Sequence, residues 1–258
     1  MADQKHPDEK KKKVKTSTFV IILVVSVVLG LANLSRDFRQ DQKDFKNDAT
    51  KMIQDLELNE ELGVNPNNAT TSYNFGSIQL MSEFAQELQP LVEQSNEILE
   101  SYYLLADMIF VDLEQSKKML TTFETQWKEL MLEAFDLYKG FEKELANYSP
   151  KNKEEKEMIK GMASSLKKKK QQQFDLLKKG LRLLTLDIER VEFLLKNQGL
   201  YTYDAETDDI DSADDGFIEG YDELIDEYNT AVDEYNFLVD ELFESQQKTQ
   251  EAFKELLT

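Results

Sequence analysis

The sequence predicts an all-α protein, in which one N-terminal transmembrane helix is followed by an elongated antiparallel bundle of three or four long helices with coiled-coil-like seams. Three observations lead to this fold class. The 258 residues include only 9 Gly and 4 Pro, and a sheet protein needs more of these turn-forming residues than a few long helices do. An uncharged run lies near the N-terminus, and apolar residues spaced three and four apart recur through the rest of the chain.

The uncharged run extends from Thr16 to Ser35, and about 20 residues of helix are needed to span the hydrocarbon layer of a bilayer. Residues 1–15 carry six Lys against three Asp or Glu, and positive charge before a first span holds that end in the cytoplasm. We therefore expect a basic cytoplasmic tail at 1–15, a transmembrane helix at 16–35 in a plasma or inner membrane, and an acidic extracytoplasmic domain at 36–258.

A cleaved secretory signal is the alternative interpretation of the same segment. Signal peptides also combine a basic start with an apolar stretch, and Gly30, Leu31 and Ala32 supply small residues at the two positions that a signal peptidase reads. The apolar stretch of a signal peptide usually has about 7 to 15 residues. Because the run at 16–35 is longer, the sequence favours a retained anchor over a secreted protein.

Composition excludes several classes of function. The net charge of −20 repels the phosphate backbone that provides most nucleic-acid affinity, so no nucleic acid is expected as a partner. The chain has no Cys, and its only His, His6, precedes the apolar run. Without these residues in the main domain, zinc sites and Ser-His or Cys-His nucleophiles are not available there. We expect that the protein is not an enzyme, although paired carboxylates, the catalytic groups of glycosidases, remain available.

Helical periodicity divides the main domain into segments separated by turn-forming residues. A kink near Pro90 or an interruption near Ser116 is expected within the second segment, because a continuous helix there would exceed about 100 Å. Gly199 is the expected stop of the third segment. The helical segments are expected at 36–62, 77–148, 152–197 and from Gly216 onward, with loops at 63–76 and 200–215.

The last segment is an internal heptad repeat whose units begin at Leu224, Ala231 and Leu238. A second apolar line lies one position further round the helix, so the apolar face is too wide for a two-stranded coil. Helices of the same chain could cover this face within a bundle, and homo-oligomerisation could cover it too. The similar stripes on all long segments favour the bundle. The second line consists of Ile218, Ile225, Val232 and Val239.

The segment from Asp204 to Glu227 holds twelve Asp or Glu and no basic residue. Aligned on Gly216, it places Asp211, Asp215 and Asp222 where a calcium loop has ligands, although Ala213 removes one ligand position and Asp222 is shorter than the usual Glu. Weak calcium binding is one hypothesis, and it gives an alternative function as a calcium- or ligand-responsive module. The other is a solvated acidic loop with Asp214 and Asp215 beside a helix N-terminus.

Two further patterns are interpreted structurally. The run Lys167–Lys170 is expected to be a solvated face that can pair with the acidic loop or the acidic last helix, and not a phosphate or membrane-surface patch, because consecutive helical residues point in different directions. Tyr221, Tyr228 and Tyr235 recur every seven residues and are expected to pack in the core rather than to receive a ligand. Trp127 is likewise expected to pack in the core.

The turn Phe193-Leu-Leu-Lys-Asn-Gln-Gly199, which leads through a polar loop to a last helix containing Tyr-Asn, resembles YiaF-like bacterial envelope proteins of unknown function. The resemblance covers residues 190–240. It implies a helical domain tethered by an N-terminal lipoprotein signal or membrane segment, and this chain lacks the cysteine of a lipid anchor. No functional residues carry over from the resemblance.

Taken together, these features predict a structural or protein-interaction role at the cell envelope. The membrane is the first expected partner, through residues 16–35. A protein partner, or a second copy of the chain, is expected to bind through exposed helix faces.

Overall fold

The computed structural model describes residues 41–56, 72–106, 109–204 and 209–257. Most of these residues are helical, and the helices pack as a bundle, so both predictions are confirmed. In chain order the elements are α2 (Asp41–Asp55), α4 (Gly76–Ala106), α5 (Leu113–Asn147), α6 (Lys153–Lys196), β1 (Tyr201–Asp204), β2 (Asp209–Ser212) and α7 (Asp215–Leu257).

The predicted tail at 1–15 and the predicted transmembrane helix at 16–35 lie outside the described residues. None of the helices in the described ranges is long and apolar enough to cross a membrane. The helix predicted at 36–62 is described between Asp41 and Asp55, and the loop predicted at 63–76 is described only from Ser72 onward.

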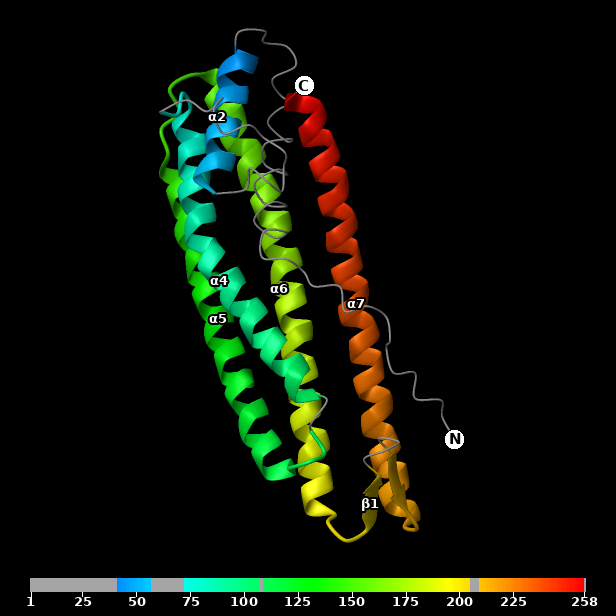
Figure 1. Ribbon diagram of the computed structural model, residues 1–258. Coiled ribbons are helices and arrows are strands. Elements are labelled where there is room, and N and C mark those ends of the chain that lie inside the picture. Colours follow the sequence, from blue (N-terminus) through cyan, green and yellow to red (C-terminus); the bar gives the residue numbers. More distant parts are fainter. Residues whose placement is uncertain (1–40, 57–71, 107–108, 205–208, 258) are drawn as a thin grey trace.

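Each long helix is antiparallel to the one that follows it in the chain (Figure 1). Helix α6 lies between α5 and α7, while α4 packs against α5, and α2 packs beside the N-terminal half of α4. The three helices α4, α5 and α6 therefore form one packed unit, and α7 is attached to its α6 side. The prediction of an antiparallel bundle with short connections holds for these four long helices.

Side-chain caps determine where two of these helices begin. The backbone N–H of Gln115 donates to the Asp112 carboxylate over 3.0 Å at the start of α5, and that of Glu155 donates to the Asn152 side chain over 2.7 Å at the start of α6. Such caps satisfy N–H groups that have no partner within the helix. Helix α4 continues through Pro90, and the predicted interruption falls before Leu113 rather than at Ser116, because Asp112 starts the new helix.

The connection between α6 and α7 was predicted as a loop, and this prediction is wrong. After Gly199, whose φ of 91° suits glycine and ends α6 as expected, β1 and β2 form an antiparallel hairpin. Tyr201 of β1 stacks on Phe217 of α7, with ring centroids 5.2 Å apart, and Ile210 packs against the same cluster. The strands are only four residues long, so their alternation is too short to be recognised in the sequence.

The apolar residues spaced three and four apart along the long helices supply the core. Most of them are buried, and the others are partly buried. Burial of these side chains is the main stabilising contribution of the bundle, at about 1.5–3 kcal/mol for each large apolar side chain. The buried seam residues are Leu120, Trp127, Leu130, Ala134 and Phe141 in α5, Leu177, Leu184 and Val191 in α6, and Phe217, Tyr221, Ala231, Tyr235 and Leu242 in α7.

Trp127 is the largest fully buried side chain and fixes how closely α5 and α6 approach. Its indole N–H donates to the carbonyl of Leu177 over 2.7 Å. The ring lies against Gly180 of α6, so closely that a Cβ atom at that position would be 2.7 Å from the nearest ring carbon. Gly180 is therefore required by close packing, although glycine weakens a helix.

We predict that Gly180→Ala lowers the free energy of unfolding by about 1–3 kcal/mol, because the added methyl group displaces the indole ring. Gly140 of α5 provides a matched control, since a Cβ there would meet no atom within 4 Å. Gly140→Ala should raise stability by about 0.5–1 kcal/mol through helix propensity. Chemical denaturation followed by tryptophan fluorescence measures the free energy of unfolding of each variant. Equal effects of the two substitutions would contradict the packing role of Gly180.

Candidate functional site

The three predicted calcium ligands lie on different parts of the hairpin and α7. Asp211 is in β2 opposite Thr202, Asp215 is the first residue of α7, and Asp222 lies two turns further along that helix. All three carboxylates are exposed. The described residues contain no group of three or more Asp, Glu, His or Cys side chains that could hold a metal ion. Residues 205–208 lie outside the described ranges, and calcium binding by the acidic segment stays a prediction.

Asp214, in the same segment, is a helix cap. The backbone N–H of Phe217 donates to its Oδ1 over 2.8 Å. The Asp214 N–H donates to the Ser212 hydroxyl over 3.0 Å, and that hydroxyl donates to the Leu200 carbonyl over 2.5 Å. This arrangement ties the end of the hairpin to the start of α7. It agrees with the second interpretation of the segment, in which negative charge lies beside a helix N-terminus.

The Lys167–Lys170 run is only partly the solvated face that was predicted. Lys167 and Lys168 are exposed, and Lys170 pairs with Glu142 of α5 over 3.0 Å. Lys169 is buried, with 7 % of its surface exposed, and its ammonium donates to the Ser245 hydroxyl of α7 over 3.3 Å. A helix turns by about 100° per residue, so one of four consecutive residues faces the neighbouring helix.

Burial lowers the pKa of Lys169 to about 8, and the nearby Lys168 acts in the same direction. In the unfolded chain this amine keeps its proton up to about pH 10.4. Between these two values the unfolded state binds more protons than the folded state, so stability rises with pH.

We predict that the free energy of unfolding rises by about 1–3 kcal/mol between pH 7.5 and 10 because of Lys169. Lys169→Met, which retains the apolar stem of the side chain, should remove this rise, whereas Lys168→Met at the exposed neighbouring position should retain it. Denaturation of fragment 36–258 at several pH values measures the effect. Parallel pH profiles for the two variants would contradict this account of Lys169.

A buried polar network joins three helices near the hairpin end of the bundle. Asp187 and Arg190 lie one turn apart on α6, and Arg190 donates to the Asp187 carboxylate over 2.8 Å. The guanidinium lies over two rings, 4.7 Å from the centroid of Tyr228 in α7 and 5.6 Å from that of Phe110. Aromatic faces stabilise a desolvated cation in this geometry. We call Tyr102, Asp187, Arg190 and Tyr228 the polar joint.

Tyr102 brings α4 into the polar joint. Its hydroxyl donates to the second carboxylate oxygen of Asp187 and lies 3.1 Å from the hydroxyl of Tyr228. Burial raises the pKa of Tyr102 well above its ordinary value, and the Asp187 carboxylate acts in the same direction, so the hydroxyl keeps its proton. Burial also raises the pKa of Asp187, against the opposing effects of Arg190 and Tyr102. Every charged group of the joint is thus paired within the protein.

The polar joint fixes helix positions rather than offering a reactive group. A shift of α4 or α7 along α6 would leave Asp187 or a tyrosine hydroxyl without a partner in an apolar environment, and this would destabilise the folded state. Of the heptad tyrosines, Tyr221 and Tyr235 are buried and Tyr228 is partly buried, so their predicted place in the core is confirmed. Burial raises the pKa of Tyr228 to about 12.

We predict that Tyr102→Phe and Asp187→Asn each lower the free energy of unfolding by about 1–3 kcal/mol, since each leaves a buried group without its partner. The double variant should lose less than the sum, with a coupling of about 1 kcal/mol or more. Denaturation of the four proteins of this double-mutant cycle measures the coupling. Strictly additive losses would show that the two side chains do not stabilise one another.

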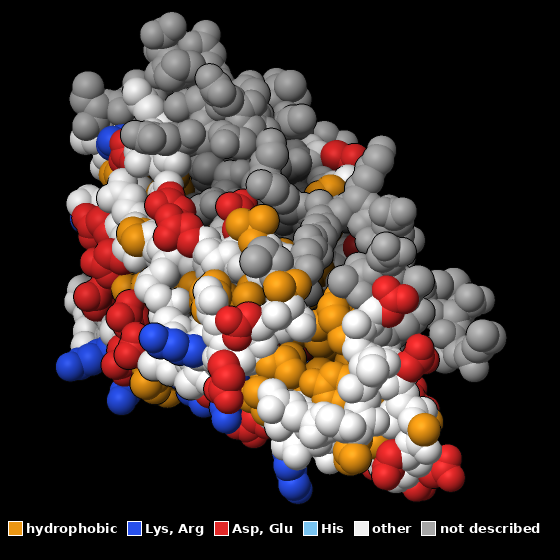
Figure 2. Space-filling model, turned by 60° about the horizontal axis from the view of Figure 1, so that its bottom comes forward, with side chains coloured by type: hydrophobic (Ala, Val, Ile, Leu, Met, Phe, Trp, Pro, Cys, Tyr) orange, Lys and Arg blue, Asp and Glu red, His pale blue; other side chains and the backbone are white. Residues whose placement is uncertain are grey.

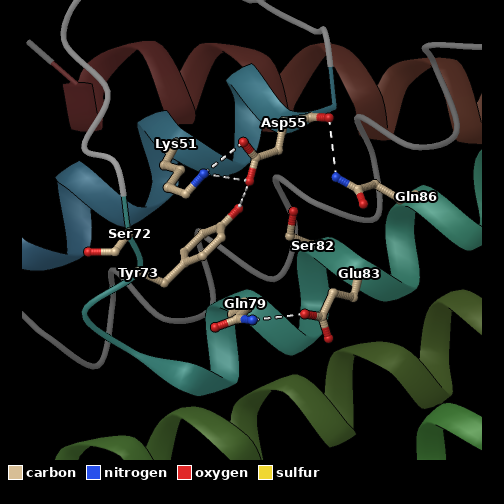
Figure 3. A pocket seen from close by; sticks show the side chains of 8 residues that line it. All are labelled: Lys51, Asp55, Ser72, Tyr73, Gln79, Ser82, Glu83 and Gln86. Carbon is tan, nitrogen blue, oxygen red and sulfur yellow. Dashed lines mark hydrogen bonds and ion pairs between the residues drawn. The ribbon is translucent and has the colours of Figure 1, made fainter.

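A polar depression of about 420 Å³ lies between α2 and α4 (Figure 3). Its groups bind one another: Lys51 contacts Asp55 over 2.9 Å, the Tyr73 hydroxyl donates to Asp55 over 2.7 Å, and Gln86 donates to the Asp55 carbonyl over 3.3 Å. These contacts hold α2 against α4. Several of the lining side chains are thus paired with one another, whereas the buried hydroxyl of Ser82 has no hydrogen-bond partner among the described residues. We assign the depression no ligand.

Asp48 also holds α2 against the start of α4, and the sequence did not predict this role. The backbone N–H groups of Asn74 and Phe75, just before α4, donate to its carboxylate over 2.8 and 2.7 Å. Burial raises the pKa of Asp48, and these hydrogen bonds oppose the shift. Because Asp48 and Phe75 are 27 residues apart, no local sequence pattern could identify the pair.

Compared with protein-family models, with curated proteins and with solved structures, the chain matches none of them. The resemblance to YiaF-like envelope proteins stays a prediction. The polar groups of the joint hold helices together, and the exposed apolar side chains on the surface of the bundle are the candidate site that remains.

Proposed function

We propose that this protein is a single-pass membrane protein whose acidic helical bundle, on the extracytoplasmic side, has a structural or protein-interaction role at the cell envelope. The membrane part of the proposal rests on the uncharged segment 16–35 and the lysines that precede it. The interaction part rests on the surface of the bundle.

The observation that carries the interaction role is the exposure of large apolar side chains on α7. Phe237 is 63 % exposed, and Ile218 and Phe243 are each 40 % exposed. Further exposed apolar residues lie on α4 and α5, among them Leu104 and Leu132. Figure 2 shows one face of the molecule, with hydrophobic side chains gathered in its middle and Asp and Glu side chains around them. Large apolar side chains that a bundle leaves exposed on its outer faces favour a binding surface.

The buried carboxylates of the described bundle support the same proposal, because each is committed to a structural partner. Asp48 accepts from the start of α4, and Asp187 belongs to the polar joint. Glu155 accepts from the Lys151 N–H over 2.6 Å and from the Tyr148 hydroxyl over 2.5 Å. Groups used in this way stabilise a bundle that can present its outer faces to a partner.

The test compares the full chain with a variant that lacks residues 16–35. We expect the full chain to stay in membranes after extraction with alkaline carbonate, because about 20 apolar residues anchor it, and the deletion variant to be released. The full chain, isolated from these membranes and sequenced from its N-terminus, should still contain residues 1–35. A soluble mature chain that begins at Asn33 would instead establish a cleaved signal peptide.

The interaction role is tested in the same membranes. Photo-crosslinking groups at exposed positions of α7 should form adducts with another protein, and the same groups at Thr121 or Thr122, which are exposed on the N-terminal half of α5, should not. Adducts that form only between copies of this chain would show self-association instead of binding to another protein.

A further inference from the structure

The outer surfaces of α5 and α6 form a basic patch on this acidic protein. Each helix contributes a row of four residues, and the successive spacings in both rows are three, four and four. Residues spaced in this way lie on one side of a helix. We call the two rows together the basic patch, and it consists of Leu132, Phe135, Lys139 and Lys143 on α5 and of Lys167, Lys170, Phe174 and Lys178 on α6.

The two rows of the basic patch contact each other. The ring of Phe135 lies edge-on to that of Phe174, with centroids 6.1 Å apart, and Lys170 lies 5.3 Å from the Phe135 centroid. Lys170 also pairs with Glu142 over 3.0 Å. The other four lysines of the patch are exposed and form no ion pair with any described residue, and Leu132 is 66 % exposed. The patch thus combines exposed apolar groups with uncompensated positive charge.

Several carboxylates of the same helix segments are paired or face elsewhere. Asp175 accepts from the side chain of Gln171 over 2.8 Å. Asp136 and Glu144 line a depression between α4 and α5, on the other flank of α5. These acidic groups therefore do not cover the lysines of the basic patch.

Helix α7 carries a complementary surface on the side turned away from α6. Phe237 is 63 % exposed, and exposed carboxylates lie four residues before it, at Asp233, and four residues after it, at Glu241. Tyr235, two residues before Phe237, is buried against α6. Because a helix turns by about 100° per residue, Phe237 points to nearly the opposite side. We call Asp233, Phe237 and Glu241 the acidic face.

The basic patch and the acidic face lie at the same height along the bundle, on opposite sides of α6 (Figure 1). The contacts between the two rows place the basic patch beside residues 167–178 of α6. On the other side of α6, Lys179 pairs with Glu234, and Lys169 donates to Ser245 over 3.3 Å. The acidic face lies at or between these two contacts, and so at the level of the patch.

We propose that the basic patch of one copy of this chain binds the acidic face of a second copy anchored in the same membrane. Copies with the same anchor are related by rotation about the membrane normal, and such a rotation leaves every residue at its own height. Two complementary surfaces can then meet only if their heights agree, as these do. This inference rests on the membrane anchor and the interaction role proposed above, and it names a partner for that role.

Charge and apolar contact both support this pairing. Each copy has a net charge of −20, but repulsion between exposed charges is largely screened beyond about 8 Å at physiological ionic strength. Lysines and carboxylates in direct contact are closer than this, and complementary charges select the partner. Phe237 of one copy would contact Leu132 and Phe135 of the next. Anchoring in one membrane raises the effective concentration, so a small interface suffices.

The contact joins two different surfaces, so each copy can bind one neighbour on either side and form a row or a ring. A contact between identical surfaces would produce only pairs. The contact also leaves other exposed apolar residues free for a different protein, among them Leu104 and Leu200, which are 73 % and 45 % exposed.

The test measures energy transfer between copies of the full chain, labelled with donor and acceptor dyes and inserted together into vesicles of neutral lipid. The chain has no Cys, so Thr121→Cys, at an exposed position outside the patch, provides a single labelling site. We expect transfer that rises with the ratio of protein to lipid, which gives an apparent dissociation constant.

Reversal of charge on either surface should weaken the association by about tenfold or more, because like charges then face one another. Lys139→Glu with Lys143→Glu makes this change on the basic patch, and Asp233→Lys with Glu241→Lys makes it on the acidic face. A chain with all four substitutions should regain the association, since opposite charges meet again. This recovery cannot arise from a variant that fails to fold.

Matched control variants carry the same kinds of substitution elsewhere. Lys118→Glu with Lys196→Glu changes the net charge equally at two exposed lysines outside the patch and should leave the association unchanged. Phe237→Ser should weaken it by about tenfold, whereas Leu104→Ser, at a more exposed apolar residue, should have no effect.

Equal effects of the patch and control variants, or no recovery in the chain with four substitutions, would overturn the proposal. Extraction with alkaline carbonate first establishes that the chain is inserted. An inserted chain without energy transfer would contradict this inference alone, because another protein can still bind the bundle. A chain that does not insert would contradict the membrane part of the proposed function and remove the reason for equal heights. Transfer that appears only with anionic lipid would assign the lysines to lipid head groups instead.

Discussion

Helix α6 buries apolar side chains on two sides, and the rest of the bundle depends on this. One row, which includes Leu177, Leu184 and Val191, packs with α4 and α5. A second, with Leu183 and Leu186, packs against Ala231 and Tyr235 of α7. Because the two rows point in different directions, α6 must lie between α5 and α7, as seen in Figure 1. Hydrophobic burial provides the stabilisation, and the close contact of Trp127 with Gly180 determines how near α5 can come.

Apolar stripes alone allow a helix to slide along its neighbour, and buried polar groups restrict this movement. The polar joint brings Asp187, Arg190 and two tyrosine hydroxyls into contact across α4, α6 and α7, and a shift of α4 or α7 along α6 would separate them. At the other end of the bundle, Asp48 fixes α2 to the start of α4. Buried polar groups contribute little net stability when they are paired. They destabilise every arrangement of the helices that leaves them unpaired. Polar side chains that would suggest a reactive site in a cleft thus act here as alignment devices.

The sequence was most informative about elements with a long repeat. Helices α6 and α7 were predicted within a few residues of their observed limits, since dozens of residues share one periodicity. The hairpin was missed because its strands are four residues long, and the burial of Lys169 was missed because its exposed neighbours dominate the local pattern. The calcium candidates Asp211, Asp215 and Asp222 were selected by spacing along the chain. Spacing says nothing of whether a strand and a helix bring carboxylates together.

The second apolar line of α7, formed by Ile218, Ile225, Val232 and Val239, shows the same division. Its residues and their seven-residue interval were visible in the sequence, as was an apolar face too wide for a two-stranded coil. Periodicity, composition and charge are local properties, so the sequence by itself determined the fold class, the helices, the acidic character and the apolar segment 16–35. Only the tertiary structure decided which helix covers which face and which polar groups meet, as Tyr102 meets Asp187 over 85 residues of chain. Such contacts depend on how helices distant in sequence pack together, and no local pattern encodes that packing.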